Sequence, residues 1–201
     1  MQKMSSLPRQ IAEYAATLPE GAPICPGSLL HLGNRAAVDQ ALSRLARRGQ
    51  LIRIFRGVYV RPVVTRFGLL APTVEKVIAA LAALWGETIV PCTGAAANVL
   101  GLTTQVPVRL VYLTSGPSRT LRLQALVVQL RHAPRWQLVA PGRPAGLAVR
   151  AMAWLGRTEA ARGLDVIARR LSPSDLAELA EVRPILPSWI ATPVSNLLAR
   201  G

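Results

Sequence analysis

The sequence predicts an α+β fold in which the first third of the chain differs in kind from the rest. Apolar residues recur at helical spacing up to residue 47, and a β-branched, aromatic run follows over residues 51–62. From residue 73 onward, helical stretches alternate with short apolar runs. With 201 residues, 51% of them hydrophobic, the chain can build one domain or two small ones. We expect a first domain over residues 1–66 and a second over residues 67–201.

The segment before residue 50 predicts three helices. Ser5 or Ser6 is a suitable N-cap for the first, which tolerates Pro8 in its opening turn and ends at a Pro-Glu-Gly segment. A short second helix over residues 26–30 begins at a proline. Asn34 is a good N-cap for the third helix, which continues to Arg47. Its inward face has apolar side chains at i, i+4 and i+7, namely Val38, Leu42 and Leu45.

After Gly49 the hydrophobic period changes. The run LIRIFRGVYVRP is interrupted at Arg56-Gly57 and closed by Pro62, a pattern typical of two short strands around a tight turn. Three helices followed by such a hairpin make up a winged helix-turn-helix. We therefore expect an N-terminal winged helix-turn-helix domain, followed by a mixed α+β domain with a small antiparallel sheet.

The charge of the chain indicates a polyanionic partner. Twenty-four Lys+Arg against 10 Asp+Glu give a net charge of +14. Residues 1–66 hold 10 basic and 3 acidic residues, and residues 67–201 hold 14 and 7, so each part has a net charge of +7. The excess is thus about twice as dense in the first third. Because only Lys3 and Lys76 are lysines, and a GC-rich genome also favours arginine, the placement of the arginines decides the argument.

At about 100° per residue, the face of the third helix opposite its apolar side chains is polar and basic. In a winged module this helix enters the major groove of duplex DNA, while a basic wing contacts the neighbouring phosphates. We expect double-stranded DNA as the partner. The residues expected to contact it are Arg35, Gln40, Ser43, Arg44 and Arg47 of the helix and Arg53, Arg56 and Arg61 of the wing. The alternative is that these arginines only cover a solvated helix and hairpin.

The second domain is expected to follow a short linker near residues 63–71, marked by Gly68 and Pro72. Helices are expected over residues 73–85, 93–102, 145–156, 162–171, 172–181 and 187–200, with Ser172 as an N-cap before Pro173. Strands are expected over residues 88–90, 108–114, 120–123 and 126–131. The last three predict an antiparallel meander.

Groupings typical of catalysis are missing from the sequence. The segment TSGPSRT lacks the spacing and the lysine of a phosphate-binding loop, so a β-turn explains it better. Cys25 and His31 match no common zinc spacing, and Cys92 is best explained as a buried structural thiol. Glu178 and Glu181, the only carboxylates paired on one expected face, more simply form a solvated edge. We expect no enzymatic activity, no cofactor and no metal.

The chain is expected to be cytoplasmic, with both cysteines reduced. Its first 21 residues contain no long uncharged apolar run before a small-residue cleavage site. Nowhere does the sequence approach the roughly 18 consecutive apolar residues that a membrane span needs.

Two sequence blocks carry a resemblance to a known family. The block VDQALSRLARRGQLIRIFRGVY, followed by LGLTTQVP and VYLTSG, resembles the AbiEi-type antitoxins of bacterial type IV toxin-antitoxin systems. The similarity covers nearly the whole chain. It implies an N-terminal domain that binds inverted repeats upstream of its own operon and represses it. It also implies a C-terminal domain that counteracts a nucleotidyltransferase-like toxin, although no residue-level motif transfers for that role.

A second function class stays open. An α+β domain after a winged helix is also typical of a transcriptional regulator that senses a small ligand and has no toxin partner. The neighbouring gene in the operon discriminates the two, because a nucleotidyltransferase gene favours the antitoxin and a transporter or metabolic gene favours the sensor.

Overall fold

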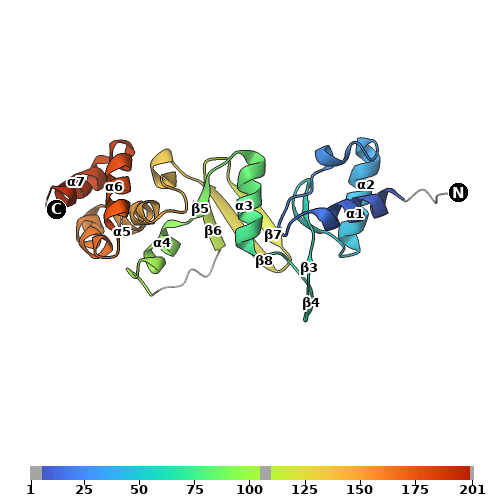
Figure 1. Ribbon diagram of the computed structural model, residues 1–201, viewed down its shortest axis with the longest axis horizontal. Helices are drawn as coiled ribbons and strands as arrows, with labels where there is room; N and C mark the ends of the chain where they lie inside the picture. The colour runs from blue at the N-terminus through green and yellow to red at the C-terminus, as the bar shows by residue number, and fades with distance from the viewer. Residues whose placement is uncertain (1–5, 105–109, 200–201) are drawn as a thin grey trace. The chain divides into compact units, whose positions relative to one another are not determined.

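The computed structural model describes residues 6–104 and 110–199 and divides them into two compact units (Figure 1). The first unit contains the described residues up to Glu87 together with Thr120–Val128. The second contains the described residues of Thr88–Arg119 and those from Gln129 onward. Ser5, Val108 and Arg109, which the sequence places in a cap and a strand, lie outside the described residues.

The first unit begins with three helices, at the positions that the sequence predicts. They are α1 (Leu7–Thr17), the 3₁₀ helix η1 (Pro26–Leu29) and α2 (Arg35–Arg47). Pro8 lies in the first turn of α1, as expected, and Ser6 occupies its N-cap. Ile11 of α1, Leu29 of η1 and Leu42 of α2 are fully buried in one apolar core. Burial of these faces is the main stabilising term for helices this short.

A hairpin follows α2, again as predicted. Strands β1 (Ile52–Phe55) and β2 (Val58–Val60) pair antiparallel, with Ile52 opposite Val60. Gly57 in the turn has a φ of 69°, a conformation that glycine adopts without strain. The backbones of Tyr59 and Ile24 exchange two hydrogen bonds of 2.7 and 3.0 Å, which tie the hairpin to the segment before η1. The α+β class is confirmed, and helices followed by strands are consistent with a winged helix.

The linker expected over residues 63–71 is wrong, because this segment forms a second hairpin. Strands β3 (Val63–Thr65) and β4 (Gly68–Leu70) pair antiparallel with Val64 opposite Leu69. Gly68, interpreted as a linker residue, instead provides the positive φ of 103° that the tight turn requires. The expected domain boundary after residue 66 falls in this turn, so the division into residues 1–66 and 67–201 stays a prediction.

Helix α3 (Val74–Trp85) packs closely on the loop that follows α1 within the first unit. A Cβ atom at Gly21 would lie 2.9 Å from the carbonyl carbon of Lys76, so only glycine fits there. Lys76 Nζ donates a hydrogen bond to Glu20, and the Thr73 backbone N–H donates another at 3.3 Å. These two bonds, the first more than the second, hold the pKa of the Glu20 carboxyl below its usual value.

A four-stranded sheet has the strand order β5-β6-β8-β7. Its strands are β5 (Ile89–Pro91), β6 (Leu110–Thr114), β7 (Arg119–Leu123) and β8 (Leu126–His132). The expected meander is wrong, since β8 and not β7 lies beside β6. The two-residue turn at Gln124, which has a φ of 55°, keeps β7 and β8 adjacent. The four residues between β6 and β7 reach about 13 Å, enough to pass the width of one strand.

The second unit also contains helices. They are α4 (Thr93–Val99), η2 (Arg135–Leu138), α5 (Pro144–Ala168), α6 (Pro173–Val182), η3 (Arg183–Ile185) and α7 (Ser188–Leu198). The predicted break between two helices occurs inside α5, where Gly156 has a φ of 75° and a ψ of 179°. Ser172 caps α6 in a reciprocal capping box with Asp175, as its position before Pro173 predicts.

Arg150 on α5 is a buried charge within this helical core. Its side chain is fully inaccessible, and Nη1 lies at a long 3.4 Å from the carbonyl oxygens of Gln137 and Val139. Nε and Nη2 have no hydrogen-bond partner in the part of the chain that the structure describes. Burial lowers the pKa of the guanidinium to about 10. Arg150 therefore costs the fold stability.

None of the helices within residues 6–104 and 110–199 has the length and apolarity that a membrane crossing requires.

Candidate nucleic-acid interface

Helix α2 is positioned by its cap and by its buried face. The side chain of Asn34 accepts a hydrogen bond of 2.9 Å from the Ala37 backbone N–H, which satisfies one of the free donors at the helix start. Val38, Leu42 and Leu45 are at most 2% exposed and fix the rotation of the helix about its axis. The opposite face is therefore held toward solvent in a defined orientation.

The exposed face of α2 is hollowed by a shallow depression of about 420 Å³. Its lining residues are Asp39, Gln40, Ser43, Arg44 and Arg47. Four of the five helix residues expected to contact DNA thus lie around one surface feature. Two of them, Arg44 and Arg47, belong to the last helical turn, where a positive charge interacts favourably with the helix dipole.

Arg35 is the exception among the predicted helix residues, because it does not line the hollow. Its Nε atom lies 2.9 Å from the Oδ2 atom of Asp39, one turn further along α2. The two side chains are 65% and 49% exposed, so this ion pair adds little to stability. Its larger effect is electrostatic, since Arg35 compensates the acidic group at the rim of the hollow.

The wing places its three predicted arginines along one hairpin. Arg53 is an exposed residue of β1 opposite Tyr59, Arg56 occupies the turn, and Arg61 follows β2. Inward-facing Ile54 is 1% exposed, and the Phe55 ring packs edge-on against Trp85 with centroids 6.4 Å apart. The hairpin is therefore anchored on one side and presents arginine on the other.

Most of these guanidinium groups are uncompensated. No ion pair between described residues involves Arg44, Arg47, Arg53, Arg56 or Arg61. All five are exposed. Unpaired exposed arginines create a positive potential that attracts a polyanion and is weakened by salt.

Arg48 and Arg66 are further exposed arginines of the first unit that the sequence did not single out. Arg48 is exposed at the C-cap of α2, directly after Arg47. Arg66 is exposed in the turn between β3 and β4, and its guanidinium carbon lies 4.7 Å from the centroid of the Phe67 ring. Arg48 could have been found from the sequence, because it directly follows Arg47 at the end of the helix. The position of Arg66 in a turn was hidden by the interpretation of its segment as a linker.

Metal-binding and thiol chemistry find little support in the described residues. No three His, Cys, Asp or Glu side chains in residues 6–104 and 110–199 are grouped to hold a metal ion. Cys25 and Cys92 are free and half-buried, and burial raises the pKa of the Cys25 thiol, which disfavours the reactive thiolate. Glu178, one of the two carboxylates paired in the sequence analysis, faces Arg143 at 3.5 Å.

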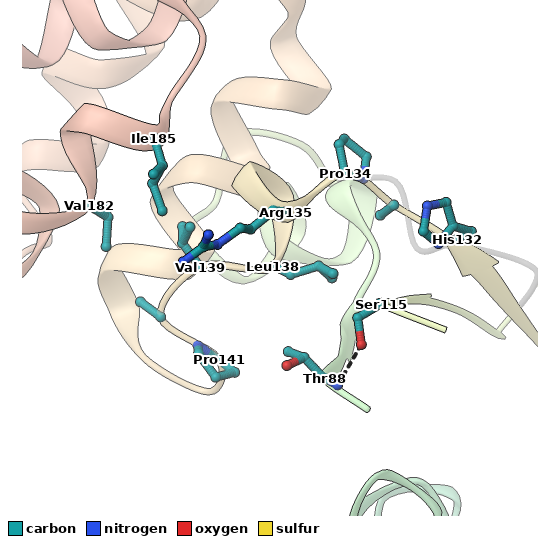
Figure 2. Close-up of a pocket in the computed structure, with 12 residues that line it drawn as sticks. Thr88, Ser115, His132, Pro134, Arg135, Leu138, Val139, Pro141, Val182 and Ile185 are labelled. Atoms are coloured by element: carbon teal, nitrogen blue, oxygen red, sulfur yellow. Dashed lines mark hydrogen bonds between the residues drawn. The ribbon is translucent and has the colours of Figure 1, made fainter. Parts of the chain in front are cut away.

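The second unit contains a separate cavity of about 570 Å³ (Figure 2). Figure 2 shows Thr88 and Ser115 on one side of it and Val182 and Ile185 on the other. Apolar side chains dominate the wall, and Arg135 supplies a charge. The Thr88 backbone N–H donates a 3.0 Å hydrogen bond to the Ser115 hydroxyl. A mostly apolar cavity with a few polar groups is the usual form of a small-molecule site.

Comparison with protein families gives one match. The profile of a family described as "Family of unknown function (DUF6088)" matches residues 10–168. The chain belongs to the DUF6088 family. The part that matches DUF6088 includes α2, the wing, the β3–β4 hairpin and the four-stranded sheet. Searches among curated proteins and among solved structures found no match for this DUF6088 chain.

Proposed function

We propose that this chain is a transcriptional repressor that binds duplex DNA at its own promoter. The observation that carries the proposal is the exposed face of α2, where Gln40, Ser43, Arg44 and Arg47 line one hollow. This face lies opposite the side chains that fix the helix in the core, so it is free to meet a partner.

The chemistry of that face fits the edges of base pairs. An α-helix fits the major groove, which is about 12 Å wide, and there each base pair presents a distinct pattern of donors and acceptors. Arginine at positions 44 and 47 can donate two hydrogen bonds to guanine, and the Gln40 amide can pair with adenine. Arg53, Arg56 and Arg61 of the wing would contact phosphates, which position the protein without reading sequence.

We also propose that the chain acts as an antitoxin against a nucleotidyltransferase-like toxin. This part rests on the resemblance of the sequence to AbiEi-type antitoxins, and no residue is assigned to it. Its test is expression of the adjacent gene with and without this chain. Rescue of a growth arrest caused by a neighbouring nucleotidyltransferase supports the proposal, and failure to rescue contradicts it.

The DNA-binding proposal is tested by paired titrations of the full chain. One duplex is taken from the DNA upstream of its gene, and the other is a scrambled duplex of the same composition. Replacing Gln40 or Arg47 with alanine should cost about 1–3 kcal/mol on the upstream duplex and much less on the scrambled one. The matched change Arg53→Ala in the wing should weaken both about equally. Equal losses on both duplexes for the helix variants would contradict sequence-specific recognition by α2.

The cavity of the second unit favours a second candidate function, a repressor controlled by a small ligand. Its volume of about 570 Å³ is suited to a molecule of metabolite size. The test adds the compound that the product of the neighbouring gene transports or converts. Release of DNA in its presence supports this candidate. The variant Ile185→Trp, which fills the cavity, should then bind DNA without responding.

A further inference from the structure

The β3–β4 hairpin exposes apolar side chains instead of burying them. Val64 is 79% exposed, Phe67 is 76% exposed and Leu69 is 52% exposed. Because Val64 pairs with Leu69, both side chains lie on the same face of the two-stranded ribbon. In Figure 1 this hairpin extends away from α1, α2 and α3 of its own unit. An isolated two-stranded ribbon this short gains little stability from the core of its unit, so packing does not explain its exposed apolar side chains.

The tip of the hairpin is held in one conformation. The Thr65 hydroxyl accepts a 3.1 Å hydrogen bond from the Phe67 backbone N–H and donates one of 2.9 Å to the Gly68 carbonyl. At the base, the Ala71 backbone N–H donates a 3.1 Å hydrogen bond to the Gln124 side chain. The Phe67 ring is thus presented to solvent on a turn whose order does not depend on a partner.

The charge of the hairpin selects among possible partners. Residues 61–72 contain two arginines, Arg61 and Arg66, and no acidic residue. In a two-fold contact between copies of the chain, the same patch meets itself, so arginines would approach arginines without an acid between them. Contact with a polyanion has no such cost, because its phosphates compensate both charges.

We propose that the β3–β4 hairpin is a second DNA-contacting element, which inserts Arg66 into the minor groove and wedges Phe67 between two base pairs. This inference rests on the proposed function, since it requires that the chain bind duplex DNA. The hairpin follows the wing directly through Arg61 and the buried Pro62, so both hairpins belong to the same compact unit.

The dimensions of the groove explain why a wedge is required. The minor groove is about 6 Å wide, whereas two paired strands alone are about 4.8 Å apart before side chains are added. Only the tip of the ribbon can therefore enter unless the groove opens. An apolar side chain inserted between base pairs opens it, unstacks the step and bends the duplex by about 20–90°. The guanidinium carbon of Arg66 lies 4.7 Å from the centroid of the Phe67 ring, so both side chains reach the groove at the tip, and the guanidinium leaves the ring face for the groove as base pairs stack on the ring.

The test uses the full chain and a 20-base-pair duplex from the DNA upstream of its gene, about two helical turns long, with a donor and an acceptor dye at its ends. The unmodified chain should raise energy transfer as it binds. Phe67→Ala should still bind with salt-dependent affinity but abolish most of this rise. Leu84→Ala is the matched control, since Leu84 on α3 is also an exposed apolar residue of the first unit, at 48%, and should bend DNA normally.

The charge of the tip is tested separately. Arg66→Gln should lower the slope of log affinity against log salt by about one unit. Arg157→Gln, at an exposed arginine of the second unit, should leave the slope unchanged. If Phe67→Ala bends DNA as the unmodified chain does, the hairpin proposal is overturned. It is also overturned if the unmodified chain binds the duplex without bending it. A third contrary result is that Phe67→Ala lowers the molecular mass of the protein in solution, as loss of a contact between two copies would, and leaves the DNA bend unchanged. If the unmodified chain binds no duplex, the proposed function fails with it.

Discussion

Salt dependence gives the most direct quantitative test of the arginine surface on α2 and the wing. Five exposed arginines, at positions 44, 47, 53, 56 and 61, make no ion pair among the described residues. If each of these arginines displaces one counterion from the DNA, whether it contacts a base edge or a phosphate, the five together contribute about −4.5 to the slope of log affinity against log salt, at about −0.9 for each contact. Affinity for duplex DNA should then fall about 500-fold between 50 and 200 mM salt.

The perturbation removes two wing charges at once, in the double variant Arg53→Gln and Arg56→Gln. Three contacts then remain, the slope becomes about −2.7, and the same change of salt should cost only about 40-fold. The assay is fluorescence anisotropy of a labelled duplex at four or more salt concentrations. Arg157→Gln is the control, because it removes the same kind of charge from the second unit.

Two results would refute this reasoning. A slope close to zero for the unmodified chain would show that phosphate contacts do not drive binding. A double variant that keeps the slope of the unmodified chain would show that the wing does not contact DNA, even though its arginines are exposed.

Three further predictions concern the stability of the fold, each measured by urea unfolding. Arg150→Met should raise the free energy of unfolding by about 1–3 kcal/mol, because burial lowers the pKa of the guanidinium to about 10 and leaves two of its nitrogens without a partner among the described residues. A destabilised variant would contradict this prediction. Asn34→Ala should lower the free energy of unfolding by about 1 kcal/mol, since the N-cap bond to Ala37 is lost, and no change would show that the cap is dispensable. The pKa of Glu20 is lowered in the folded state, so its bond to Lys76 stabilises the fold above the ordinary carboxyl pKa and is lost as the pH falls through the lowered value. Glu20→Gln should therefore reduce the decline in the free energy of unfolding between about pH 6 and pH 3. An unchanged decline would count against the Glu20–Lys76 pair.

The elements that the sequence predicted well are those with strong local signals. Asn34, Gly57 and Ser172 mark a helix start, a turn and another helix start, and each has the predicted role in the structure. The rotation of α2 followed from the period of its apolar residues, so the composition of its exposed face could be derived from the sequence alone. The i, i+4 spacing of Arg35 and Asp39 also predicts their ion pair, although Arg35 was expected to contact DNA.

Features that depend on distant residues could not be predicted in this way. Strands β3 and β4 have three residues each, too few for an alternating pattern, so Gly68 and Pro72 indicated a linker. Strand order in the sheet is decided by pairing between segments and not by the apolar runs themselves. The cavity is lined by segments from Thr88 to Ile185, and no local pattern connects them.

The first unit is discontinuous in sequence, since the chain leaves it after Glu87 and returns for Thr120–Val128. Gln124, in the middle of that returning segment, accepts the hydrogen bond from Ala71 at the base of the β3–β4 hairpin. Any uninterrupted piece of the gene that encodes the complete first unit therefore also encodes part of the second unit. Recombination that joined a foreign effector after residue 66 or residue 87 would separate the hairpin from this support. In this architecture the first unit and the part of the chain that follows it are expected to be inherited together, and shuffling of such modules between proteins is disfavoured.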